Sequence, residues 1–106
     1  MITFDDFKKI EIKTAKILDV KDHPDADRLY VVDVDLGEEK RQVVAGIKNH
    51  YKPDELIGKS VAVVCNLEPA TIRGVESNGM ILAASADENM AILTLDKDLP
   101  PGSTVK

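Results

Sequence analysis

The stretch that decides the fold is Arg28-Leu29-Tyr30-Val31-Val32-Asp33-Val34-Asp35-Leu36. Its even-numbered side chains from Tyr30 to Leu36 are all apolar and fall on one side of an extended chain, while Leu29 and Val31 fall on the other. A period of two is typical of a β-strand that buries one face. We therefore expect a β-strand here, and we search both flanks for partners.

Upstream, a second alternating segment places four apolar side chains on one face: Ile10, Ile12, Leu18 and Val20. Lys16 interrupts this pattern and predicts a bend or bulge in a long strand. The cluster His-Pro-Asp-Ala-Asp at 23–27 predicts the turn between the two strands.

Downstream, shorter apolar runs predict further strands at 41–45, 60–66, 80–85 and 91–95. Helical signals are confined to a capped turn at 4–8, which begins after Thr3, and to one turn at 52–58. Many short strands with little helix favour a small barrel or sandwich. The count fits best an all-β OB-fold, a five-stranded Greek-key barrel with short helices, formed as one domain over 1–106.

Composition bounds the class of protein. Apolar residues make up 43% of the 106 residues and charged residues 31%, which fits a globular domain. Aromatic residues reach only 4%, so the core must be aliphatic. The single cysteine, Cys65, allows no internal disulfide, lies in an apolar run and is expected to be a buried structural thiol. With no apolar stretch of about 18 residues, we expect a cytoplasmic protein without a membrane segment.

The net charge of −5 argues against charge-driven binding of nucleic acid. Only the segment 38–60 is net positive, and its cations either extend an RNA footprint or are ordinary solvated side chains: Lys40, Arg41, Lys48, Lys52 and Lys59. An anion site must therefore be built from a few placed groups. The scarcity of aromatic residues also argues against a site that stacks single-stranded bases.

The densest candidate site is the stretch Asn66–Met80. Arg73 offers a planar fork for phosphate or a base edge, and Asn66 and Ser77 supply compact hydrogen-bonding groups. Two glycines flank Ser77 and allow close backbone approach, while Met80 adds a deformable apolar surface. The same residues also fit an ordinary strand–loop–strand connection with Met80 in the core, and the pattern alone leaves both interpretations open.

Other clusters point to no catalysis, metal or cofactor. Asp22, His23, Asp25 and Asp27 lack the glycine and glutamate of a calcium loop and are explained by turn chemistry. His50 is an exposed loop histidine by default. No nucleophile lies in a pattern with a base, so an enzyme is not expected.

Five segments together resemble the tRNA-binding domain family, whose members include free-standing structure-specific tRNA-binding proteins, modules of methionyl-tRNA synthetases and the endothelial-monocyte-activating polypeptide domain. The similar segments are 7–13, 23–30, 43–47, 51–59 and 66–84. The likeness runs over essentially the whole chain, and the stretch Asn66–Met80 is its most specific part.

This resemblance implies a non-catalytic OB-fold that binds the tRNA elbow by shape, as a homodimer in free-standing members, or with methionyl-tRNA synthetase. Its RNA-facing positions correspond here to Lys13, Asn66, Arg73, Gly74, Ser77, Gly79 and Met80. Glu68 and Thr71 stand where many relatives carry lysine, which predicts fewer phosphate contacts. The alternative is a protein-interaction or chaperone-like module with weak or no RNA affinity.

Overall fold

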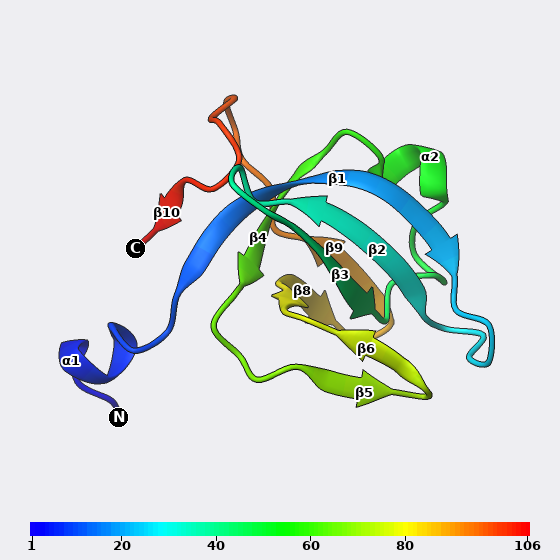
Figure 1. The fold of residues 1–106 in the computed structure, drawn as a ribbon, viewed down its shortest axis with the longest axis horizontal. Helices are drawn as coiled ribbons and strands as arrows, with labels where there is room; N and C mark the ends of the chain where they lie inside the picture. The colour runs from blue at the N-terminus through cyan, green and yellow to red at the C-terminus, as the bar shows by residue number, and fades with distance from the viewer.

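The computed structural model describes residues 1–106 and contains one curved antiparallel sheet with two attached hairpins (Figure 1). The strands of the sheet are β1 (Ile12–Asp22), β2 (Tyr30–Asp35), β3 (Lys40–Ala45), β4 (Ser60–Val64), β7 (Met80–Ile81) and β10 (Thr104–Val105). They follow the order β3-β2-β1-β4-β7, and β10 pairs with the start of β1. The end strands β3 and β7 approach each other, so the sheet nearly closes. The predicted all-β barrel of the OB type, with short helices, is confirmed.

β1 is long because its first half pairs with β4 and its second half with β2. The register shifts between Ile17 and Asp19, which leaves Leu18 without a partner in β2. This bulge turns Leu18 outward and places Ile17 in the core. The predicted irregularity is present, but it lies two residues after Lys16. The assignment of Leu18 to the buried face was wrong, because the bulge reverses the alternation at that point.

The barrel interior is aliphatic, as the composition predicts. Valines from four strands pack with Ile17 and Leu56 in a buried cluster. Tyr30 is the only aromatic residue among its buried members. The Tyr30 hydroxyl donates to the carbonyl of Tyr51 at 2.7 Å, so its polar end is satisfied inside the core. In β2 the even-numbered residues from Tyr30 to Val34 are buried, as predicted from their alternation.

Two short helices lie outside the barrel. In α1 (Phe4–Phe7), the Thr3 hydroxyl accepts from the amide of Asp6 at 3.1 Å, and the Asp6 carboxylate accepts from the amide of Thr3 at 3.2 Å. Phe4 is exposed, so the two phenylalanines of α1 do not share a buried face. The second helix, α2 (Pro53–Leu56), buries Leu56 beneath β1. Neither helix has the length and apolar character needed to cross a membrane.

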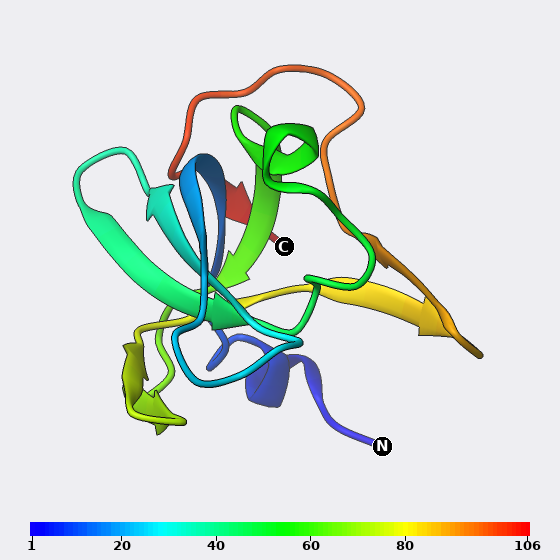
Figure 2. The same cartoon turned by 90° about the vertical axis from the view of Figure 1, so that its right-hand side faces the viewer.

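Two hairpins extend from the barrel: β5 (Ala70–Ile72) with β6 (Val75–Ser77), and β8 (Ala83–Ala86) with β9 (Asn89–Ile92). Figure 2 shows β8–β9 projecting from the body, whereas β5–β6 lies along its lower edge in both views. The sequence indicated a connection where β5–β6 lies and one strand over 80–85, which the structure divides between β7 and β8.

The last residues fold back on β1. The hydroxyl of buried Thr14 donates to the carbonyl of Pro100 at 3.2 Å and accepts from the amide of Ser103 at 3.0 Å. The amide of Gly102 donates to the carbonyl of Thr14 at 2.7 Å. This segment is therefore part of the barrel wall.

Candidate nucleic-acid interface

The predicted site stretch, Asn66–Met80, forms an arm whose outer part is the β5–β6 hairpin. Ile72 pairs with Val75, so Arg73 and Gly74 are the two residues of the turn. Both have positive φ, 53° and 89°, as a two-residue turn that matches the twist of the strands requires. A side chain at Gly74 would meet nothing within 4 Å, so the tip is open. The fold therefore places Arg73 at an exposed tip, with its backbone in the conformation that the turn requires.

The hairpin tip contacts the turn that follows β1. The His23 ring nitrogen Nε2 lies 3.0 Å from the carbonyl oxygen of Ile72, and Arg73 Nη2 donates to the carbonyl of Asp25 at 3.1 Å. The two segments lie side by side in both views of the ribbon (Figures 1 and 2). Residues about fifty positions apart in sequence thus form one surface.

An open hollow of about 420 Å³ lies at this joint, lined by Asp25, Ala26, Asp27, Arg28, Leu29 and Arg73. Arg28 and Arg73 both belong to its lining, and a guanidinium group provides a planar set of donors suited to phosphate oxygens. Asp25 and Asp27 offset this charge, so binding here depends on contact geometry more than on long-range attraction. The sequence did not indicate Arg28 as a binding residue, because it follows an acidic turn in a net-negative segment.

Ser77 and Gly79 hold the arm against the barrel. The Ser77 side chain is buried; its hydroxyl accepts from the amide of Val44 at 2.9 Å and donates to the carbonyl of Gly79 at 3.0 Å. Gly79 has φ +135°, and a Cβ there would lie 3.2 Å from Val63 Cγ1 and 3.3 Å from Val43 Cγ1. These two residues connect the arm to β3 and to the start of β7, and they fix where the arm leaves the barrel.

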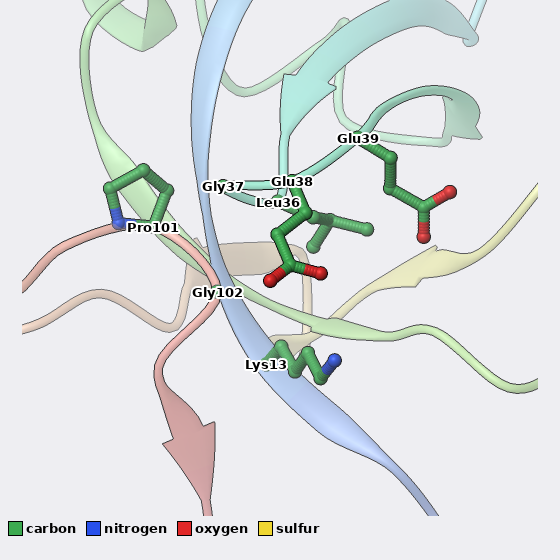
Figure 3. A pocket seen from close by; sticks show the side chains of 7 residues that line it. All are labelled: Lys13, Leu36, Gly37, Glu38, Glu39, Pro101 and Gly102. Carbon is green, nitrogen blue, oxygen red and sulfur yellow. The ribbon is translucent and has the colours of Figure 1, made fainter.

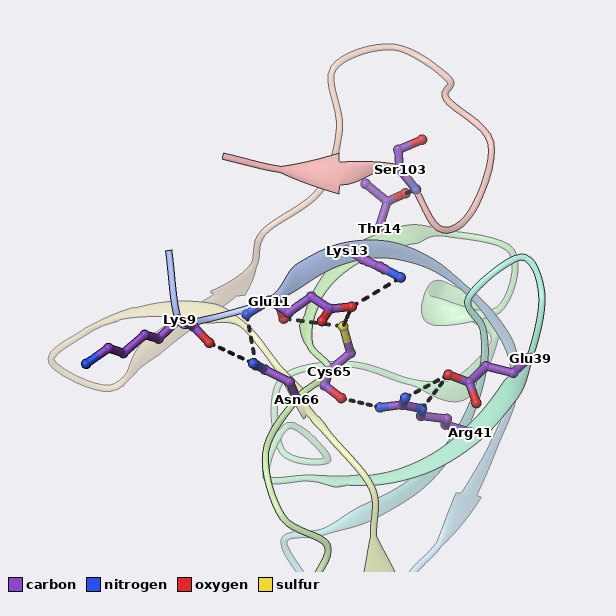
Figure 4. Close-up of polar contacts among 9 residues, drawn as sticks. All are labelled: Lys9, Glu11, Lys13, Thr14, Glu39, Arg41, Cys65, Asn66 and Ser103. Carbon is purple, nitrogen blue, oxygen red and sulfur yellow. Dashed lines mark hydrogen bonds and ion pairs between the residues drawn. The ribbon is translucent and has the colours of Figure 1, made fainter. Parts of the chain in front are cut away.

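Asn66 holds the other end of the arm to the N-terminal segment (Figure 4). Its amide oxygen accepts from the backbone nitrogen of Glu11 at 2.8 Å, and its amide nitrogen donates to the carbonyl of Lys9 at 2.7 Å. Both ends of the side-chain amide are thus engaged within the protein, and the geometry gives Asn66 a positioning role.

Lys13 lies on β1 in a different hollow, of about 440 Å³, which Figure 3 shows from close by. Its ammonium group pairs with the Glu11 carboxylate at 3.2 Å. The hydrogen bond and charge of this pair raise the pKa of Lys13 and lower the pKa of Glu11. Glu38 and Glu39 line the same hollow, so carboxylates outnumber cations in its lining and the site is unfavourable for phosphate.

Two cations of the net-positive segment are already paired. Arg41 forms an ion pair with Glu39 at 2.7 Å and donates to the carbonyl of Cys65 (Figure 4). Lys48 pairs with Asp22 at 3.3 Å. These contacts leave fewer free cations than the sequence count indicates. Cys65 is buried as predicted, and burial, followed by the nearby Glu11 charge, raises the pKa of its thiol.

Met80 lies apart from the arginines, in an apolar hollow of about 290 Å³ between the barrel and the β8–β9 hairpin. Its side chain is 46% exposed, so it does not belong to the core. The hollow is lined by Val44, Ala45, Gly46, Ile47, Met80, Ile81, Leu82, Ala83 and Met90.

The structure therefore brings only Arg73 and Gly74 of the predicted residues together at an exposed tip. The other predicted residues lie elsewhere. Asn66 contacts the N-terminal segment, and Lys13 lies in the neighbouring acidic hollow. Ser77 and Gly79 lie between β3 and β7, and Met80 lies in the apolar hollow. Two further residues lie at the joint: His23 contacts Ile72, and Arg28 lines the same hollow as Arg73. The sequence of the His-Pro-Asp-Ala-Asp-Arg segment indicated a turn and a family resemblance, but it did not indicate that this turn meets the hairpin.

Comparison with known proteins places the chain in a family. The model of the family described as "Putative tRNA binding domain" matches residues 12–104. A methionine–tRNA ligase of Methanococcus aeolicus is 57% identical over 105 residues, which are 99% of this chain and 16% of that protein. The chain spans only about one-seventh of the length of the curated relatives that it matches.

Solved structures show the same fold. A MetRS related protein from Pyrococcus horikoshii has a TM-score of 0.94 and 30% identity, with 100% of this chain and 98% of that chain covered. A CsaA chaperone protein from Picrophilus torridus has a TM-score of 0.92 and 33% identity, with both chains covered completely. The family match spans most of the chain, and the chain therefore belongs to the tRNA-binding domain family.

Proposed function

We propose that this chain is a non-catalytic module that binds tRNA by its shape and presents it to methionyl-tRNA synthetase in the cytoplasm, as a free-standing protein or as an accessory part of the enzyme. The observation that carries the proposal is the joint at which Arg28 and Arg73 line one open hollow. Family membership and the similarity to methionine–tRNA ligases support the choice of tRNA as the ligand.

The charge distribution supports a geometric rather than an electrostatic mode of binding. The chain carries a net charge of −5, and two cations of its most basic segment are held in ion pairs. No aromatic side chain lines the arginine hollow, so stacking of bases on aromatic rings contributes nothing there. Folded RNA presents phosphates and 2′-hydroxyls at fixed spacings, and a rigid pair of guanidinium groups recognises such spacing.

The predicted RNA-facing residues then divide by role. Arg73 contacts RNA directly, with Gly74 allowing close approach at the tip, and Met80 flanks the bound surface. Asn66, Ser77 and Gly79 hold the arm in shape, whereas Lys13 stays paired with Glu11 and contributes little to phosphate binding. Glu68 and Thr71 are both exposed, so their replacement of lysine lowers the number of phosphate contacts.

Presentation of tRNA requires only that the module remains near the enzyme. A bound tRNA held close to a synthetase has an effective concentration far above its bulk value, and this raises its capture without any new chemistry. In a dimer, binding of tRNA to one copy raises its effective concentration at the second copy, so two modest sites together bind more tightly than one.

The chain forms a homodimer through the β8–β9 hairpin. All four side chains of β8 are exposed and uncharged, and β8 has a backbone partner only in β9. An unpaired, uncharged edge strand is a template for a second strand. Sedimentation of the chain tests this: a dimer that dissociates on Ala84→Glu supports the interface, and a monomeric wild-type chain contradicts it.

A second candidate function is that of a protein-interaction or chaperone-like module. It is favoured by the apolar hollow around Met80 and by the structural similarity to a CsaA chaperone protein. Binding of extended apolar peptides without any affinity for tRNA would support it over the first proposal.

Nuclease footprinting of tRNA with the chain tests the proposed mode of binding. Protection confined to the outer corner, where the two arms of tRNA meet, is expected for recognition of shape. Uniform protection along the molecule, or none at low salt, would contradict the proposal. Footprints on tRNAs of different sequence are expected to coincide, because phosphate contacts carry no sequence information.

A further inference from the structure

His23 lies at the centre of the joint between the turn after β1 and the β5–β6 hairpin. Its side chain is 95% buried, since only 5% of its surface is exposed. The ring nitrogen Nδ1 accepts from the backbone amide of Asp25 at 2.9 Å, and Nε2 lies 3.0 Å from the carbonyl oxygen of Ile72. Because Nδ1 accepts a hydrogen bond, the ring proton of neutral His23 must be on Nε2, which donates to Ile72.

The two contacts join different segments. The Nδ1 contact fixes the turn that carries Arg28, while the Nε2 contact reaches across to the strand that ends at Arg73. The backbone of His23 also donates to the carbonyl of Leu29 at 3.1 Å, so the turn is closed on itself.

Little else holds the hairpin tip in place. Its base is attached to β3 through Gln42, whose side chain donates to the carbonyl of Glu76 and whose carbonyl accepts from Asn78, both at 2.8 Å. At the tip, only the His23 and Arg73 hydrogen bonds reach the neighbouring turn. Strands of three residues are short, and a two-stranded hairpin is marginally stable by itself.

We propose that His23 is a positioning residue for RNA binding, which locks the hairpin onto the turn and thereby fixes Arg73 beside Arg28 in one hollow. The inference rests on the proposed function, because it assigns His23 to the presentation of those two arginines. Without the lock, both guanidinium groups remain on the molecule, but their separation fluctuates and a fixed phosphate spacing is no longer matched.

Two substitutions separate the halves of this lock. Glutamine carries its amide nitrogen about as far from the backbone as histidine carries Nε2, so His23→Gln keeps the donor to Ile72. Asparagine is shorter and places its oxygen where Nδ1 lies, so His23→Asn keeps the acceptor for Asp25 and loses the link to the hairpin. Each variant is the matched control for the other.

The test measures the affinity for a fluorescent tRNA at low salt, together with amide hydrogen exchange of β5 and β6. His23→Asn is expected to weaken tRNA binding about 3- to 10-fold, as for loss of one hydrogen bond, and to speed exchange in the hairpin. His23→Gln keeps the link to the hairpin and loses only the contact within the turn, so it is expected to lose clearly less affinity than His23→Asn. In an Arg73→Asn background, His23→Asn is expected to have almost no further effect, because positioning acts through Arg73.

Several results would overturn the inference. One is an equal loss of affinity on His23→Asn with and without Arg73, and another is unchanged affinity in a folded His23→Asn variant with a loosened hairpin. If His23→Asn does not fold at the assay temperature, His23→Gln decides, since a change in its tRNA affinity that does not follow the change in hairpin exchange contradicts the lock. Absence of tRNA binding by the wild type overturns the proposed function, and this inference with it.

Discussion

Replacement of Arg73 by asparagine removes the guanidinium group without disturbing the turn that carries it. Arg73 has φ +53° and precedes Gly74 at φ +89°, and Asn-Gly is the preferred pair for a two-residue turn of this geometry. Asparagine adopts positive φ more readily than arginine, which offsets the lost hydrogen bond to Asp25, itself worth about 0.5–1.5 kcal/mol. The free energy of unfolding is therefore expected to change by less than about 1 kcal/mol.

The effect on RNA binding is expected to be much larger. A hydrogen bond to a charged group contributes about 1.5–3 kcal/mol, so Arg73→Asn should weaken tRNA binding by about tenfold or more. It should also lower the slope of log affinity against log salt by about 1, the value for one phosphate contact.

Fluorescence anisotropy with labelled tRNA at several salt concentrations measures both quantities. Lys97→Asn is the matched control: it removes one exposed positive charge from the segment 93–103, which lies opposite the hairpin in both views (Figures 1 and 2). Its affinity and slope are expected to stay close to those of the wild type. If Arg73→Asn binds tRNA like the wild type with an unchanged slope, the hairpin tip is not part of the interface.

Three further predictions concern the residues that hold the site in shape. Ser77→Ala leaves the buried amide of Val44 without its acceptor, so thermal unfolding should show a loss of about 1–3 kcal/mol, and an unchanged melting temperature would contradict the closing role of Ser77. Asn66→Ala removes both bonds to the N-terminal segment, and amide exchange of residues 4–11 should become faster; equal exchange rates would show that the clamp is dispensable. Burial raises the pKa of the Cys65 thiol, so its stabilising contribution is complete below the pKa of the unfolded thiol, about 8.5, and is lost as the pH rises through the folded value. Chemical denaturation at increasing pH should show this decline in the wild type and a smaller one in Cys65→Ala.

The fold was predictable because its signals are local. The residues predicted to alternate from Tyr30 to Leu36 form β2 and the residue after it, and their even-numbered side chains are buried. Thr3 and Asp6 cap α1 as expected. The inner face of β1 was not predictable up to Leu18, where Ala15 and Ile17 are the buried residues, although Val20 beyond the bulge is buried as expected. A bulge depends on the partner strand and leaves no reliable mark in the sequence.

The site was predictable only in part, because polar residues in a connection look alike whether they bind RNA or backbone. Ser77 and Asn66 both resemble ligand-binding residues in sequence, yet their partners are backbone groups 33 and 55 positions away. The β5–β6 turn was missed because arginine, rather than the usual asparagine or aspartate, precedes Gly74. Long-range contacts of this kind, including that of His23 with Ile72, appear only in the folded chain.

Titration of the wild-type chain with tRNA at two salt concentrations, about 50 and 200 mM, tests the central claim most directly, with an unstructured RNA of equal length as the control. The account predicts saturable binding of tRNA that weakens with salt through only a few phosphate contacts, and clearly weaker binding of the unstructured RNA at both concentrations. Equal affinity for the two RNAs, or no binding of tRNA at the lower salt concentration, would contradict it.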